Sequence, residues 1–355
     1  MVAVPLSEDE QRILHEIERQ FYEHDPAFAR QVGSTTVYSH AGRNLKWAAL
    51  GFVAGLVLGV GFAFLRERMD DRIHGRAELE AAVGAPVLAV VPKVKGWRKK
   101  SQTPLVTTSA SGSPAAEAYR SLRTNLQFIS RDGRIRVISV TSPEAGEGKT
   151  TTVANLAATL ARTGKKVVAL SADLRKPRLH RFFGLANDQG LTSILAGQAQ
   201  LADAARRVEG LDSLRVVTSG PIPPNPAELL SSDEMESLLD QLRSTADYVV
   251  IDTAPALYVS DPMIVAPRVD GVLVVVDADE TTGGAASHAV DQLAQVGAKV
   301  IGSVLNGFDA SKARYYGRYA YRYHHRYGDV GENGAKAASG NGGRAAGRTS
   351  DEVWR

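Results

Sequence analysis

The hydrophobic pattern near the start of the chain predicts two helices of different kinds. In residues 5–28, apolar side chains from Ile13 to Phe21 recur at helical spacing among acidic residues, which is typical of a soluble helix. Residues 47–65 carry no charge, and every position is apolar or glycine. As a helix, this segment would be about 28 Å long, which nearly matches the hydrocarbon core of a bilayer. We therefore expect one transmembrane helix over 47–65, with a buried core helix as the alternative.

A different pattern occupies residues 115–308. Short runs rich in β-branched residues alternate there with longer stretches of helical periodicity. Such alternation predicts an α/β fold, in which a parallel sheet carries helices on both faces. The predicted strands are residues 135–140, 167–170, 214–217, 248–251, 272–276 and 300–305.

The segments around this domain differ from it in composition. Residues 93–100 hold five cations and a tryptophan, which suits either an anionic headgroup surface or a solvated linker. Residues 101–114 are rich in Ser, Thr and Pro, and residues 328–355 consist mainly of glycine, alanine, asparagine and charged residues. The expected organisation is an N-terminal helical segment of unknown role (1–46), a transmembrane helix (47–65), a juxtamembrane segment and linker (66–114), the α/β domain (115–308), a tyrosine-rich tail (309–327) and a disordered tail (328–355).

Overall composition narrows the function classes. Hydrophobic residues make up 44% and charged residues 23% of the 355 residues, which is ordinary for a globular protein. There is no cysteine, so disulfide scaffolds, thiolate zinc sites, iron–sulfur clusters and cysteine-dependent phosphatases are excluded. A net charge of +3 is too small to indicate nucleic-acid binding by itself.

The strongest chemical signal is the run Thr141-Ser-Pro-Glu-Ala-Gly-Glu-Gly-Lys-Thr150, which joins a predicted strand to a predicted helix. In that context, glycines let backbone N–H groups surround phosphates, and the helix N-terminus adds partial positive charge. Lys149 would neutralise the β and γ phosphates, and Thr150 would place its hydroxyl on Mg²⁺. The usual first glycine is replaced by Pro143. The residues expected to bind nucleotide are Glu144, Ala145, Gly146, Glu147, Gly148, Lys149, Thr150 and Thr151.

Two aspartates follow predicted strands. Asp252 comes directly after 248–251, and Asp173 lies just past 167–170. A carboxylate at the end of a neighbouring strand can hold Mg²⁺ across from a phosphate-binding loop, and Asp173 could also take a proton from an incoming hydroxyl. A helix N-cap is the alternative for Asp173. We therefore expect Lys149, Asp173 and Asp252 to be catalytic, and Thr150 to join the two aspartates as a metal ligand.

These ordered motifs resemble the bacterial tyrosine kinases of capsule and exopolysaccharide assembly. The loop is similar to that family's Walker A motif because position 144 is glutamate, where partition ATPases of the ParA and MinD type have a second lysine. Leu170-Ser-Ala-Asp-Leu-Arg175 resembles the family's second Walker motif, and Ile251-Asp-Thr-Ala-Pro255 its Walker B motif. The resemblance spans roughly residues 62–327.

The resemblance implies a membrane-bound, cytoplasmic kinase that uses Mg-ATP and controls capsule or exopolysaccharide synthesis and export. It further implies a ring-shaped homo-oligomer assembled through Glu117, Arg120 and Arg123, although that spacing alone would equally give surface pairs on a helix. Subunits of the family phosphorylate one another on a tail, here Tyr315, Tyr316, Tyr319, Tyr321, Tyr323 and Tyr327. The resemblance implies further partners, namely a separate activator or chain-length regulator, polymerase and export proteins, and a tyrosine phosphatase. It does not imply a nucleic-acid partner.

Two departures from the family pattern bear on function. Its second Walker motif usually has two aspartates, and the first is Ser171 here, which cannot act as a carboxylate base. The family commonly has two membrane helices around an extracytoplasmic domain, whereas this chain shows one. Residues 1–46 instead resemble the start of small actinobacterial membrane proteins of unknown function.

Three other functions remain open from the sequence. A partition-type ATPase would hydrolyse ATP to switch its association, but Glu144 and the tyrosine cluster argue against it. A nucleotide-binding scaffold with weak or lost kinase activity would account for Ser171. The arginines between the tail tyrosines would also suit stacking on single-stranded nucleic acid, or simple disorder.

Overall fold

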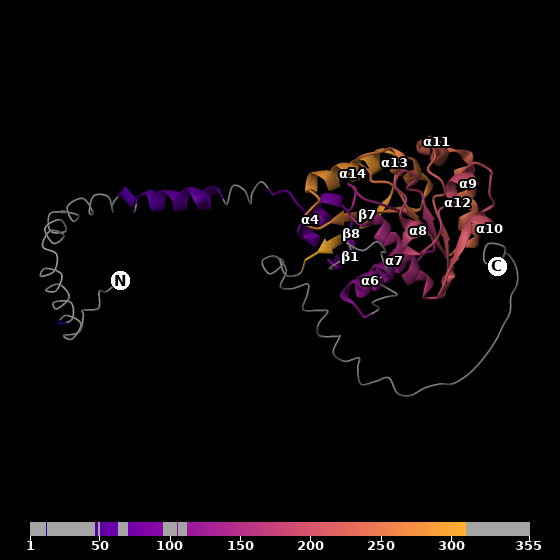
Figure 1. Cartoon of the computed structure of the whole chain (residues 1–355), viewed down its shortest axis with the longest axis horizontal. Helices are drawn as coiled ribbons and strands as arrows, with labels where there is room; N and C mark the ends of the chain where they lie inside the picture. Colours follow the sequence, from indigo (N-terminus) through magenta and orange to yellow (C-terminus); the bar gives the residue numbers. More distant parts are fainter. Residues whose placement is uncertain are drawn as a thin grey trace, which may run out of the picture. The chain divides into compact units, whose positions relative to one another are not determined.

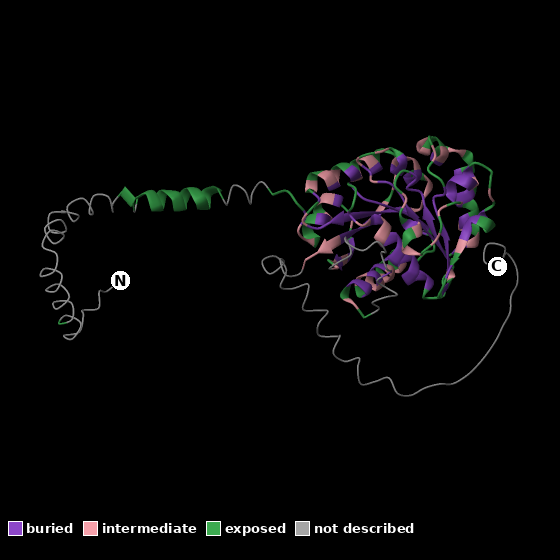
Figure 2. Ribbon diagram, viewed as in Figure 1, coloured by how far each residue is buried: buried purple, intermediate pink, exposed green. Residues whose placement is uncertain are grey.

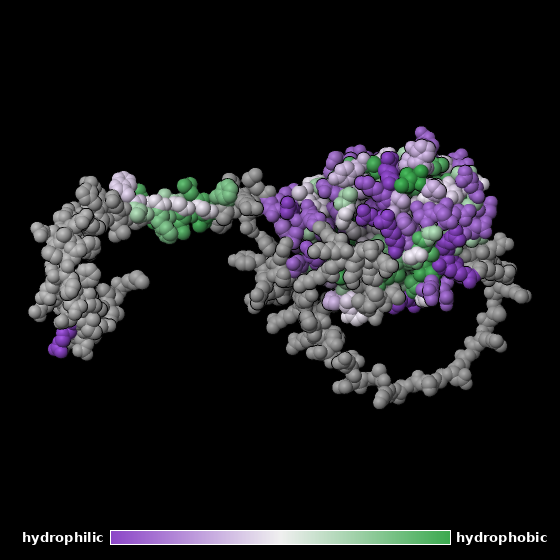
Figure 3. All heavy atoms as spheres, viewed as in Figure 1, coloured by the Kyte–Doolittle hydropathy of each residue, from purple (hydrophilic) through white to green (hydrophobic). Residues whose placement is uncertain are grey.

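The computed structural model describes residues 12, 47–48, 50–62, 70–94, 105 and 112–309 (Figure 1). The chain divides into two units, Met1–Asp70 and Asp71–Arg355. In the first unit, residues 50–62 form an exposed helix with largely apolar side chains (Figure 3). Within the described ranges, no helix has both the length and the apolar character needed to cross a bilayer, so the predicted transmembrane helix over 47–65 is not confirmed.

Several predicted segments lie outside the described residues. They are the soluble helix over 5–28 apart from residue 12, most of the basic segment 93–100, the tyrosine-rich tail and the C-terminal tail.

The second unit is built on one eight-stranded sheet. Its strands are β1 (Val87–Pro92), β2 (Val137–Thr141), β3 (Val167–Ser171), β4 (Ala205–Val208), β5 (Leu211–Val217), β6 (Tyr248–Asp252), β7 (Gly271–Asp277) and β8 (Val300–Phe308). Their order across the sheet is β1-β8-β7-β2-β6-β3-β5-β4, and every neighbouring pair is parallel except β4 with β5. The predicted α/β fold with a parallel sheet is therefore confirmed, and all six predicted strands are present.

Helices cover both faces of this sheet (Figures 1 and 2). The helices are α4 (Arg76–Val83), α6 (Pro114–Ile129), α7 (Lys149–Ala161), α8 (Leu179–Phe182), α9 (Leu191–Leu195), α10 (Leu201–Ala204), α11 (Pro226–Ser231), α12 (Asp233–Thr245), α13 (Asp261–Val265) and α14 (Gly283–Gln295). Helices α6 and α7 pack on one face, and α4, α12 and α14 pack on the other.

Burial on both faces explains why the strands are continuous apolar runs. All seven residues of β7 are buried. Leu273 and Val275 pack on the α7 side, whereas Val272 and Val274 pack on the α4 and α14 side. Because successive side chains of a strand point to opposite faces, both sets must be apolar. The same alternation decides which strand-end residues face α7.

The folded unit extends upstream of residue 115, where the domain was expected to begin. Helix α4 and strand β1 fall in the segment 66–114 that was interpreted as juxtamembrane and linker. Strand β1 pairs with β8, and Leu79 of α4 and Val91 of β1 are fully buried. Strand β1 is short, and its partner is the last strand among the described residues, so nothing in the local pattern indicates the pairing.

The burial of Leu79 makes the role of this upstream segment measurable. We expect Leu79→Ala to lower the free energy of unfolding by about 2 to 5 kcal/mol, because it removes core contacts and leaves a cavity. The measurement is urea denaturation of the full chain. Val296→Ala, at a site 37% exposed, is the matched control and should change little. Equal stability of the Leu79→Ala variant and the wild type would show that 76–83 is not part of the cooperative unit.

Candidate nucleotide and phosphotransfer site

The phosphate-binding loop predicted from the sequence lies between β2 and α7. Strand β2 ends at Thr141, and α7 begins at Lys149. Gly146 and Gly148 have φ angles of 95° and 94°, a left-handed conformation that favours glycine. The N-terminus of α7, with its unpaired backbone N–H groups, opens directly from this loop, which is the arrangement of an anion site.

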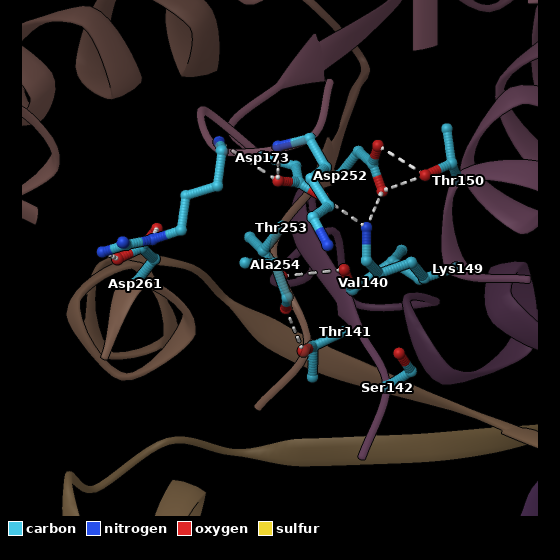
Figure 4. Close-up of polar contacts among 12 residues, drawn as sticks. Val140, Thr141, Ser142, Lys149, Thr150, Asp173, Asp252, Thr253, Ala254 and Asp261 are labelled. Carbon is cyan, nitrogen blue, oxygen red and sulfur yellow. Dashed lines mark hydrogen bonds and ion pairs between the residues drawn. The ribbon is translucent and has the colours of Figure 1, made fainter. Parts of the chain in front are cut away.

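Lys149 lies between two carboxylates from neighbouring strands (Figure 4). Its Nζ atom is 2.7 Å from Asp173 Oδ2 and 3.7 Å from Asp252 Oδ1. Burial disfavours the ammonium ion, but Asp252 and Asp173 outweigh that effect and raise the pKa of Lys149. The lysine side chain therefore stays charged at the base of the loop.

Asp252, at the end of β6, is the more deeply buried of the two acids. Burial raises its pKa to about 6, and the Lys149 ammonium opposes that shift. Thr150 Oγ1 donates to the Asp252 carboxylate, at 2.9 Å from Oδ2 and 3.1 Å from Oδ1. A threonine hydroxyl beside a carboxylate is a pair of hard oxygen donors, which suits Mg²⁺.

Asp173 lies just beyond the end of β3. Its Oδ1 atom accepts hydrogen bonds from the backbone N–H groups of Lys176 at 3.0 Å and Arg175 at 3.3 Å. Burial raises the pKa of Asp173, but Lys149 and these hydrogen bonds outweigh burial, so that the pKa lies below its ordinary value. Asp173 thus has one oxygen that fixes a turn and one that faces Lys149. Arg175 in turn pairs with Asp261 through two bonds of 2.8 and 2.9 Å.

Comparison with known proteins identifies the family of this chain. A family model described as an AAA domain matches residues 135–303. Tyrosine-protein kinase YwqD of Bacillus subtilis (strain 168) is 40% identical over 225 residues, which cover 63% of this chain and 94% of YwqD. The chain belongs to the bacterial tyrosine kinases. The family and the enzyme class predicted from the ordered motifs are thereby confirmed.

Other relatives within the tyrosine kinase family agree. Putative tyrosine-protein kinase EpsB of Ralstonia solanacearum is 37% identical over 295 residues, which cover 79% of this chain and 39% of EpsB. The chain thus spans about two fifths of that relative. Among solved structures, the kinase domain of Escherichia coli tyrosine kinase ETK has a TM-score of 0.62 and 32% identity, covering 67% of this chain and 94% of that domain.

The N-terminal part matches a different family model, described as a protein of unknown function (DUF3040), over residues 4–88. This match ends inside β1, although the structural boundary between the two units lies at Asp70 and Asp71. Sequence similarity to that model therefore continues into the folded kinase unit.

Ser171 is the residue at which the resemblance described above implied an aspartate. It ends β3 and is the register partner of Asp252 on β6. Val167 and Ala169 of the same strand pack on the α7 side, so Ser171 faces that side as well. Its hydroxyl is buried and has no hydrogen-bond partner among the described residues. This kinase therefore places an unpaired hydroxyl, rather than a third carboxylate, beside Asp252.

The loop residues predicted to bind nucleotide do not all face the same way. Glu144, Ala145 and Gly146 are exposed, whereas the Glu147 side chain is only 4% exposed. Glu147 points into the protein and contacts Thr281, which precedes α14. Burial raises the pKa of Glu147 to about 7. Thr281 was not found by sequence reasoning, because no local signal marks a threonine so far along the chain.

The predicted assembly residues lie on α6. Glu117 Oε2 is 2.6 Å from Arg120 Nη2, and both side chains are at least one third exposed. The Nε atom of Arg123 is buried and has no hydrogen-bond partner within the described part of the chain. Helix α6 packs against α7, the helix that begins at Lys149.

The place of Ser171 beside Asp252 can be tested by substitution. We expect Ser171→Asp to destabilise the nucleotide-free chain in EDTA by about 1 to 3 kcal/mol, because it buries a further unpaired like charge. The same variant should gain more thermal stability than wild type from Mg-ADP. Ser171→Asn has a similar size without the charge and is the matched control. Equal shifts for the two variants in EDTA and in Mg-ADP would place residue 171 away from the metal.

Proposed function

We propose that this kinase is a Mg-ATP-dependent autokinase that transfers the γ-phosphate to tail tyrosines of a neighbouring subunit. The contact between Lys149 and the carboxylates of Asp173 and Asp252 carries this proposal. It assembles, at one edge of the sheet, a cation for phosphate, oxygen ligands for a metal and an acid that can accept a proton.

In the proposed complex, the phosphates of ATP compete with Asp173 for Lys149. The nucleotide is held by the backbone from Glu144 to Thr151 and by Lys149. As Lys149 turns to the phosphates, Asp173 Oδ2 loses its partner and becomes available to the acceptor hydroxyl. The tyrosine oxygen then bonds to the γ-phosphorus as the bond from that phosphorus to the bridging oxygen breaks, ADP leaves, and the phenolic proton passes to Asp173.

The donor set suits Mg²⁺ bound together with nucleotide. Among the described residues, no group of three or more His, Cys, Asp or Glu side chains could hold a metal alone. Thr150, Asp252 and Asp173 instead offer one hydroxyl and two carboxylates, and Mg²⁺ is usually held by one or two carboxylates with substrate phosphates. When bound, the ion would neutralise charge on the phosphates in the transition state.

The assembly and the biological role are proposed on the family resemblance. Glu117, Arg120 and Arg123 would join subunits into a ring, which brings one subunit's tail to another's site. The kinase would then control capsule or exopolysaccharide synthesis and export. Its partners would be a separate activator or chain-length regulator, polymerase and export proteins, and a tyrosine phosphatase. Each tail phosphate would add about −1.5 to −2 charges, so phosphorylation of several tyrosines would turn the arginine-rich tail anionic.

Transfer to the tail has a direct test. The full-length chain is incubated with γ-labelled ATP and Mg²⁺, and phosphotyrosine is measured. We expect wild type to label, whereas Lys149→Met, which removes the phosphate cation, and a variant with all six tail tyrosines changed to Phe should lose at least about 100-fold in label. Tyr258→Phe, an exposed tyrosine outside the tail, is the matched control and should label normally. ATP hydrolysis without phosphotyrosine would support a partition-type ATPase. Nucleotide binding without either hydrolysis or phosphotyrosine would support a scaffold.

We also propose that residues 47–65 anchor the kinase in the bacterial cell membrane as a single pass, with the kinase unit in the cytoplasm where ATP is available. Nineteen uncharged positions support this. The full-length chain should then stay with membranes through high-salt and carbonate washes and be released by detergent. Its appearance in the carbonate supernatant would contradict a spanning helix.

A further inference from the structure

Glu147 is a buried acid of the phosphate-binding loop that the proposed transfer does not use. Its Oε2 atom accepts a hydrogen bond from the backbone N–H of Glu144, at 2.8 Å. Its Oε1 atom accepts one from the hydroxyl of Thr281. With 4% exposure, the side chain points away from the open face of the loop on which Glu144 and Ala145 lie.

The Thr281 hydroxyl has its hydrogen committed to Glu147. Thr281 is 2% exposed, and its Oγ1 atom accepts a hydrogen bond from the backbone N–H of Asp277 at 3.2 Å. A hydroxyl has one hydrogen to donate, and here that hydrogen goes to the Glu147 carboxylate. The contact therefore ties the loop to the turn after β7.

The side chain of Asn306 holds the same part of the loop by binding the loop's backbone. Its Nδ2 atom donates to the carbonyl oxygen of Glu147 at 2.9 Å. A Cβ atom on Gly148 would lie 2.2 Å from that nitrogen, so the close approach requires glycine. Asn306 of β8 is the register partner of Asp277, the last residue of β7, so Asn306 and Thr281 both lie near the same ends of two neighbouring strands.

We propose that Glu147, Thr281 and Asn306 form a latch that fixes the shape of the phosphate-binding loop, and that the Glu147 side chain positions the loop for the nucleotide rather than contacting the nucleotide. Gly146 and Gly148 give the loop the positive φ angles that aim backbone N–H groups inward, but glycine also leaves a loop many other conformations. The latch removes those conformations before nucleotide arrives, so less ordering remains to be done on binding. This inference rests on the proposed nucleotide site.

The latch itself is testable in the full-length chain without ligand, by hydrogen exchange. Thr281→Val removes the hydroxyl at nearly constant shape, and Glu147→Ala removes the carboxylate. Both should speed exchange of the loop amides, including that of Glu144, by about tenfold, on the order of one hydrogen bond to a charged group. Thr281→Ser keeps the hydroxyl and should restore the wild-type rate. Exchange in α12 is the internal control for general loosening. Unchanged loop exchange in both disruptive variants would overturn the latch.

The positioning role is tested by ADP affinity, measured by calorimetry on the same variants. We expect Thr281→Val and Glu147→Ala to bind ADP about tenfold more weakly. The double variant should bind no more weakly than Glu147→Ala alone, because Glu147→Ala already removes the contact with Thr281 that Thr281→Val removes. Thr281→Ser should bind as wild type does. Faster loop exchange with unchanged ADP affinity would overturn the positioning role, as would fully additive losses. Normal ADP binding without tyrosine labelling would count against the proposed autokinase alone.

Discussion

The ammonium group of Lys149 lies against two buried carboxylates, one at the end of β6 and the other just beyond the end of β3. Because β3 and β6 are parallel neighbours, their ends meet at one edge of the sheet, and α7 starts at the same edge. The attraction holds the pKa of Asp173 below its ordinary value but only partly offsets the burial of Asp252. Two acids and one cation leave this cluster short of positive charge, and a metal ion with a nucleotide supplies charge of both signs. This charge balance agrees with the proposal that metal and nucleotide bind together.

Ser171 limits the negative charge of this cluster. A third acid in register with Asp252 would add another charge that burial disfavours. The hydroxyl avoids that cost, and in the proposed reaction it leaves Asp173 as the group that takes the proton next to Lys149.

Local sequence patterns predicted most of the fold and the residues at the centre of the site. The six strands of the prediction are buried on both faces, so their apolar runs are plain in the sequence, and the glycine-rich loop with its two aspartates depends on short spacings. Thr281 and Asn306 could not be found this way. They lie 134 and 159 residues from Glu147, and only the sheet order brings them together. Strand β4 was missed for another reason, since its edge position lets two of its four residues be arginine.

The pairing of β1 with β8 has a consequence for how the chain folds. About 200 residues separate the two strands, although they are neighbours in the sheet. Contacts between such distant segments slow folding, because a long loop must close before they form. During synthesis, β1 emerges early and remains without its partner until β8 has been made. A chain that stopped before β8 would leave β1 unpaired and expose the edge of β7, and unpaired strands of this apolar composition are prone to aggregate.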